Sequence, residues 1–263
     1  MSKCLIFFGQ NRLSEVFVYY LNKQINLEEY DIYISGWLYD KSKLDLFKKY
    51  FTITNFNFID PVEYLQQTIN SFNVKNKAEI FKLCTSENLC RAYAQHISVD
   101  NIKNFVDLKK YQSIYITRSD TVNLFVLPKI NHNNTIYDKI VKEKINGNFL
   151  YGDGQGCYNF CFNFLKNTIQ YYDDLNNTKK GSPRFLWYNN AIKSGVNIKS
   201  LKLTSLFIRP GVENYNWKNP QTIDKWGLYV KLKNNTNCVN NIKFNEISTD
   251  TLISYKRKYL DIC

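Results

Sequence analysis

The residues with the clearest potential for chemistry are an arginine and an aspartate that follow a predicted buried strand. Residues 113–117 (SIYIT) are mostly β-branched or aromatic, and Arg118-Ser119-Asp120 comes directly after them. A guanidinium binds phosphate through paired hydrogen bonds, and a carboxylate can hold a metal ion or a sugar hydroxyl. The alternative is a turn that stops the strand, in which Asp120 bonds to its own backbone. Two opposite charges at a strand end favour a binding site.

The first two predicted strands of the chain also end in residues suited to binding a ligand. The first ends in FFGQNR, where Gly9 allows a close approach and Gln10 and Arg12 offer donors to a base or a phosphate. The second ends in ISGW, where Trp37 offers an aromatic face for stacking. The alternatives are a plain strand-to-helix turn at Gly9 and a core position for Trp37. The sequence has neither GxGxxG nor a Walker pattern, which excludes a dinucleotide fold and a P-loop enzyme.

The order of the predicted elements indicates the α/β fold class. Alternating strands and helices predict a mostly parallel central sheet flanked by helices, with ligands bound beyond the carboxyl ends of the strands. We therefore expect Gly9, Trp37 and Asp120 to meet in one crevice. Strands are predicted at residues 3–9, 30–37, 51–58, 113–117, 123–127, 201–208 and 226–232. Helices are predicted after Ser14, Asp40 and Asp60, over 76–95, 99–110 and 155–174, and between Pro183 and Gly195.

The bulk composition bounds the class of protein. The 263 residues are 44% hydrophobic, enough for a single domain over 1–263, with 210–263 as an alternative C-terminal appendage. The net charge of +12 suits an anionic partner, but the basic residues are dispersed, so we expect a local phosphate site and no specific nucleic acid. No apolar run reaches the ~18 residues of a membrane span, and the N-terminus lacks a signal-peptide pattern. A cytoplasmic protein with reduced cysteines is expected, in the host cytoplasm if the source is viral.

Several motifs carry a family resemblance through their order and spacing. FFGQNR (7–12) is similar to SGQLR, ISGW (34–37) to STW, and AQHIS (94–98) to a Gln-then-Ser helix start. The stretch IYITRSDTV (114–122) matches IRTRFDL. Further on, NGNFLYG (146–152) has the spacing of NDQFAFG, and SPRFLWYNNAIKSGVNI (182–198) and FIRPG (207–211) follow in order. Over about its first 210 residues, the chain resembles a family of GT-A-like (Rossmann-like) glycosyltransferases of bacterial polysaccharide loci and large DNA viruses.

The resemblance implies transfer of a sugar from a nucleotide-sugar donor to a glycan or other hydroxyl acceptor, in the hexosyltransferase class. The barrier is departure of a charged diphosphate, which a divalent cation (Mn²⁺ or Mg²⁺) or basic side chains must stabilise. In this interpretation Asp120 holds the metal ion or the sugar. Arg12, Arg118 and Arg209 face the phosphates.

Two acids of the family pattern are missing from this chain. The aspartate of NDQF falls on Gly147, and a helix-opening glutamate falls on Arg184. An inverting enzyme needs a base near the acceptor, and Asp153 is the candidate, with His96 behind it. His96 is alternatively a helix-start residue. If the lost acids are essential, the alternative function is a non-catalytic nucleotide-sugar or glycan-binding protein on the same fold.

Overall fold

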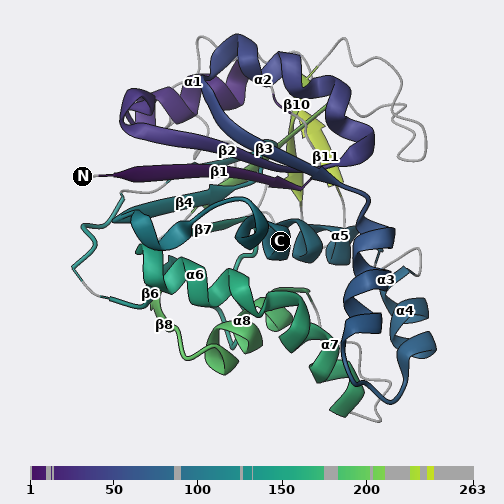
Figure 1. Cartoon of the computed structure of the whole chain (residues 1–263). Coiled ribbons are helices and arrows are strands. Elements are labelled where there is room, and N and C mark those ends of the chain that lie inside the picture. The colour runs from purple at the N-terminus through teal and green to yellow at the C-terminus, as the bar shows by residue number, and fades with distance from the viewer. Residues whose placement is uncertain are drawn as a thin grey trace. The chain divides into compact units, whose positions relative to one another are not determined.

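The described part of the chain forms two units, shown in Figure 1 as a computed structural model. It covers residues 2–9, 13, 15–85, 90–124, 127–131, 133–174, 183–201, 204–210, 226–231 and 236–239. Unit 1 consists of Met1–Asn11, Glu28–Arg118 and Pro128–Leu201, and unit 2 of Arg12–Leu27, Ser119–Leu127 and Lys202–Cys263. The chain therefore passes from unit 1 to unit 2 between Arg118 and Ser119. The single-domain assignment, with its alternative appendage at 210–263, stays a prediction.

Unit 1 is built on a seven-stranded sheet with the order β3-β2-β1-β4-β7-β6-β8. The first four strands in this order are parallel, β7 is antiparallel to both of its neighbours, and β6 and β8 are parallel to each other. The predicted α/β class with a mostly parallel sheet is confirmed. The strands are β1 (Lys3–Gly9), β2 (Tyr30–Trp37), β3 (Ile53–Ile59), β4 (Ser113–Thr117), β6 (Thr135–Asp138), β7 (Phe149–Gly152) and β8 (Asn197–Ser200).

Helices flank the sheet of unit 1 on both faces, with α2 on one side and α5 and α6 on the other (Figure 1). Asp60 caps α3 as the sequence predicts, because its side chain accepts hydrogen bonds from the backbone N–H groups of Val62 and Glu63. The helices are α2 (Leu44–Tyr50), α3 (Pro61–Ser71), α4 (Lys77–Thr85), α5 (Cys90–Asn101), α6 (Gly154–Phe162), α7 (Phe164–Asp174) and α8 (Pro183–Lys193).

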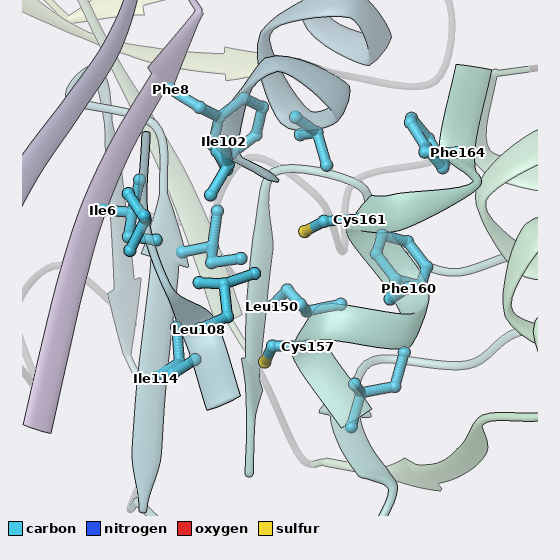
Figure 2. Packing of buried hydrophobic residues seen from close by; sticks show 14 of the residues in the cluster. Ile6, Phe8, Ile102, Leu108, Ile114, Leu150, Cys157, Phe160, Cys161 and Phe164 are labelled. Atoms are coloured by element: carbon cyan, nitrogen blue, oxygen red, sulfur yellow. The ribbon is translucent and has the colours of Figure 1, made fainter. Parts of the chain in front are cut away.

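Alternate residues of β1 pack on opposite faces of the sheet, as a strand buried on both sides requires. The ring of Phe7 lies 5.4 Å from that of Phe47 on α2. Ile6 and Phe8 belong to the core on the other face, which includes Cys157 and Phe160 of α6 (Figure 2). Cys4, Cys157 and Cys161 are buried and free.

Several predicted boundaries are wrong in the second half of unit 1. The predicted helix 155–174 is two helices that meet at Asn163, and the predicted helix 76–95 covers α4 and the start of α5. The predicted helix 99–110 holds only the end of α5 and the short 3₁₀ helices Ile102–Asn104 and Leu108–Lys110. The sequence reading missed β6, β7 and β8, which have four residues each. Such short strands show too few alternations for a period of two to stand out.

Unit 2 contains α1 (Glu15–Gln24) and a four-stranded antiparallel sheet with the order β11-β10-β9-β5. The strands are β5 (Thr121–Leu124), β9 (Thr204–Pro210), β10 (Trp226–Lys231) and β11 (Thr236–Val239). The predicted strand 123–127 thus begins earlier, directly after Asp120. Within the described ranges, no helix is long and apolar enough to cross a membrane.

Candidate functional site

The carboxyl ends of three neighbouring parallel strands meet at one edge of the unit 1 sheet, which we call the carboxyl edge. Gly9 at the end of β1 lies opposite Gly36 of β2. Phe7 lies opposite Thr117, so β4 ends at the same edge and Arg118 follows it. The predicted convergence of these strand ends is therefore confirmed within unit 1.

Gly9 ends β1 in a conformation that favours glycine. Its φ of +82° is a left-handed conformation that glycine adopts without strain. A Cβ added to Gly9 would make an ordinary contact with Gln95 Cγ at 3.9 Å and, apart from its chain neighbours, no closer contact with the described heavy atoms. The backbone of Gly9 is thus shaped for a turn, and the residue itself is buried.

Trp37 occupies the core position that was the alternative to a stacking face. It is buried, and its Nε1–H donates hydrogen bonds to Ser98 Oγ at 2.8 Å and to the Ala94 carbonyl at 3.2 Å. Both partners lie on α5, so Trp37 fastens this helix to the end of β2. The prediction that Trp37 offers a ring to a ligand is corrected for this reason.

A chain of buried polar groups continues this anchoring towards β3. Ser35 Oγ donates to the Ser98 carbonyl at 2.6 Å and accepts from Asn101 Nδ2 at 3.1 Å. Asn57 Nδ2 in turn donates to Asn101 Oδ1 at 3.1 Å. Buried polar networks that are satisfied in this way hold one arrangement rigidly. The strand ends at the carboxyl edge are consequently pre-organised.

Arg118 connects the end of β4 to the start of β7. Its backbone N–H donates to the Asn148 carbonyl at 3.3 Å, and the residue is largely buried. Because β7 is antiparallel to β4, Asn148 before β7 belongs to the carboxyl edge too. The turn that precedes β7 therefore helps to hold Arg118.

Asp138 is an acid at the carboxyl edge that sequence reasoning missed. It ends β6, which runs in the same direction as β4, and it is fully buried. Its Oδ1 accepts from the Lys139 N–H at 2.6 Å and its Oδ2 from the Gly147 N–H at 3.4 Å. Burial raises the pKa of Asp138 to about 8, while these N–H groups and the charge of Arg184 act to lower it. The only available signal was an aspartate closing the short run TIYD.

Both positions where the resemblance places an acid adjoin Asp138. Gly147 donates to its carboxylate, and Arg184 contributes a favourable charge. Gly147 has a φ of +71°, a conformation that disfavours most side chains, and a Cβ there would touch the Trp187 ring at 3.5 Å. Asp138 is thus the carboxylate that this chain supplies next to the two substituted positions.

Asp153 lies at the opposite edge of the sheet, which we call the amino edge. Gly152, just before it, pairs with Ile114 near the start of β4. The carboxylate of Asp153 accepts backbone hydrogen bonds from Gly156 at 2.9 Å, Asn134 at 3.1 Å and Thr135 at 2.6 Å. It caps α6 and orders the start of β6. The prediction that Asp153 is the base near the acceptor is corrected, because β7 carries it to the end of β4 that lies opposite Arg118.

His96 is enclosed in the core and is also corrected as a candidate base. It is 1% exposed, and its ring lies 4.9 Å from the Phe164 ring and 6.2 Å from the Trp187 ring. Burial lowers its pKa to about 3. A histidine enclosed in this way does not reach an acceptor sugar.

Asp120 lies in unit 2, two residues after Arg118, where one segment of unit 1 ends. It is buried, and the hydroxyl of the neighbouring Thr121 donates to its Oδ1 at 3.3 Å. The predicted meeting of Asp120 with Gly9 stays a prediction. Arg209 lies on β9 opposite Gly227, but its side chain is outside the described residues, as are Gln10 and Arg12 entirely.

Comparisons with known proteins give a structural likeness and no sequence match. No family model matches the chain, and no curated protein does. Among the solved structures that match is mouse xyloside xylosyltransferase 1 in its apo form, at 8% identity and a TM-score of 0.41. The match covers 76% of this chain and 84% of the mouse chain.

The described residues fit a divalent cation only in part. They contain no group of three or more His, Cys, Asp or Glu side chains that could hold a metal ion. Mg²⁺, however, is commonly held by one or two carboxylates together with substrate phosphates and water. A single carboxylate such as Asp120 fits a cation that arrives with a diphosphate.

Proposed function

We propose that this chain is a glycosyltransferase that moves a sugar from a nucleotide-sugar donor to a hydroxyl group of a glycan or another acceptor. The observation that carries the proposal is the carboxyl edge of unit 1. There β1 ends in Gly9, which has no side chain, β2 ends in the anchored Trp37, and Arg118 follows β4. Ligands of α/β sheets bind beyond such strand ends. The first motifs of the family resemblance, FFGQNR, ISGW and IYITRSDTV, contain the ends of these three strands.

The chemistry of the edge suits a leaving diphosphate. Sugar transfer breaks the bond between the anomeric carbon and the diphosphate oxygen, and negative charge develops on that oxygen. Arg118 would supply a positive charge for it, from a position whose backbone N–H is bonded to the Asn148 carbonyl. The absence of a side chain at Gly9 would let the donor's phosphates or ring approach the backbone closely.

A divalent cation, if bound, would be held by Asp120 and the donor's phosphates, and would neutralise part of the diphosphate charge. In that role Asp120 would orient the donor through its carboxylate. Thr121, whose hydroxyl bonds to Asp120 Oδ1, would help to orient that carboxylate.

A non-catalytic nucleotide-sugar or glycan-binding protein is the second candidate. The observation that favours it is the placement of the predicted bases. Asp153 is a helix cap at the amino edge, and His96 is enclosed in the core. Asp138, at the carboxyl edge, is fully buried. A binding protein needs the nucleotide site at this edge but no base.

A thermal-shift screen against nucleotide sugars, with and without Mn²⁺, tests the proposal first. Specific stabilisation by one donor nucleotide is expected, because a ligand that binds only the folded chain raises its melting temperature. Release of free sugar or transfer to an acceptor then separates the enzyme from the binding protein. Stabilisation without turnover under any acceptor condition favours the second candidate.

The Asp120→Asn variant tests the proposed role of that carboxylate. Turnover of the donor should fall roughly 10²-fold or more, the usual effect of one well-placed electrostatic contact. The melting temperature should change little, because asparagine also suits a turn. Full turnover in Asp120→Asn would leave Asp120 as a turn residue only.

A further inference from the structure

Two adjacent apolar side chains are exposed directly after β2. Leu38 is 51% exposed and Tyr39 is 62% exposed, the largest fraction among the described large hydrophobic residues. Single exposed apolar residues are ordinary, but adjoining ones at a strand end where ligands bind point to a contact surface. Neither residue belongs to the family motifs in the sequence.

The ring of Tyr39 stands on a rigid support. It belongs to the 3₁₀ helix Leu38–Lys43, and its centroid lies 5.4 Å from the ring of Trp37, which two hydrogen bonds fix to α5. The next residue, Asp40, is buried and bonds to Lys43 Nζ at 2.5 Å. Residues on both sides of Tyr39 are therefore anchored. An aromatic ring that is exposed but pre-organised loses little entropy when a ligand covers it.

The strand ends next to β2 indicate which kind of ligand Tyr39 would contact. β2 lies beside β1, and Gly36 pairs with Gly9, while Arg118 follows β4 on the other side of β1. From this order we propose that Tyr39 is the platform on which the base of a nucleoside diphosphate stacks. This inference rests on the proposed function and names the part of the donor that β2 would recognise. In this arrangement the ring of Trp37 packs against the ring of Tyr39 and supports it.

Stacking on an aromatic face tolerates every base, because each base has a π-face. Tyr39 is thus expected to contribute affinity for nucleoside diphosphates in general. A ligand with phosphates but no base would gain nothing from it. Inorganic pyrophosphate therefore separates the base contact from the phosphate contact.

Calorimetric titration of UDP, GDP and pyrophosphate with Mn²⁺ tests the inference on the full chain. In Tyr39→Ala the affinity for the nucleoside diphosphate that binds best should fall roughly tenfold, the usual scale of one lost stacking contact. Tyr39→Phe should bind it like the wild type, Tyr39→Leu should resemble Tyr39→Ala, and pyrophosphate binding should be the same in all four proteins. Phe162→Ala is the matched control, because Phe162 is another exposed ring, 45% exposed on α6.

The outcomes separate the inference from the proposed function. Tight nucleotide binding that survives unchanged in Tyr39→Ala and Tyr39→Leu would overturn the role of Tyr39 and leave the proposed function standing. A wild-type chain that binds neither nucleotide at millimolar concentration would overturn both. An equal loss for nucleotide and pyrophosphate would also reject stacking. Unchanged melting temperatures verify that the variants are folded.

Discussion

The two edges of the unit 1 sheet differ in how much room they leave around their glycines. At the amino edge, a Cβ on Gly154 would lie 2.3 Å from the Tyr111 carbonyl oxygen and 2.5 Å from that of Leu108, closer than real contacts allow. At the carboxyl edge, a Cβ on Gly9 would meet only Gln95 Cγ at 3.9 Å among the described non-neighbouring atoms. An added methyl group would therefore overlap backbone atoms at Gly154, whereas Gly9, although buried, has room for one.

The acidic residues at the two edges also differ in the groups that surround them. Asp153 at the amino edge accepts three short backbone hydrogen bonds and fixes the start of α6. Asp138 at the carboxyl edge adjoins Gly147 and Arg184, the positions where the resemblance predicts acids. Residue type alone therefore does not identify a site in this fold. The direction of the strand that carries a residue decides at which edge of the sheet the residue lies.

The largest loss of stability should come from adding a methyl group at the amino edge. Gly154→Ala should destabilise the fold by about 3 kcal/mol, since the new methyl group overlaps backbone oxygens that cannot move aside easily. Gly9→Ala should cost only about 1 kcal/mol, the strain of a positive φ. Gly195→Ala is the control for that strain, because its φ is +65° with nothing within 4 Å of a Cβ. Urea denaturation of the three variants measures the difference, and equal losses would mean that the edges do not differ.

Removing the cap at the amino edge should have the next largest effect. Asp153→Ala should lower the free energy of unfolding by about 2 kcal/mol, because it deprives backbone N–H groups of their acceptor. Asp153→Asn keeps one acceptor oxygen and should cost less. Nucleoside diphosphate affinity should stay unchanged in whichever variant folds. A folded Asp153→Asn protein that binds donor normally but has lost turnover would restore Asp153 as a catalytic candidate.

The smallest effect concerns the pH dependence of stability that Asp138 contributes. Its pKa is raised from 3.8 to about 8 in the folded chain, so the folded state retains a proton that the unfolded state releases. The stabilisation is complete below pH 4 and is lost as the pH rises towards 8. Between pH 6 and pH 7 this group alone should lower the free energy of unfolding by roughly 1 kcal/mol. Asp138→Asn should show that much less pH dependence in parallel denaturation curves, and identical slopes would contradict the raised pKa.

The sequence predicts those features that depend on local patterns. The strands at 3–9, 30–37 and 113–117 and the Asp60 cap are confirmed, because apolar runs and capping residues act over a few positions. The edge at which Asp153 lies depends on the antiparallel direction of β7, which only pairing with distant strands determines. Trp37 and Tyr39 are both aromatic, so their sequence does not tell which one α5 covers. Asp138 was missed because it ends a strand of four residues.

Hydrogen exchange measured with and without a nucleoside diphosphate and Mn²⁺ tests most directly whether the carboxyl edge is the binding site. Ligand contacts should slow exchange of backbone amides in peptides that cover 36–41 and 117–121. Peptides that cover the amino edge, at 111–114 and 153–157, should exchange at the same rate with and without the ligand. Protection of the amino-edge peptides, with the carboxyl-edge peptides unchanged, would contradict the proposed site.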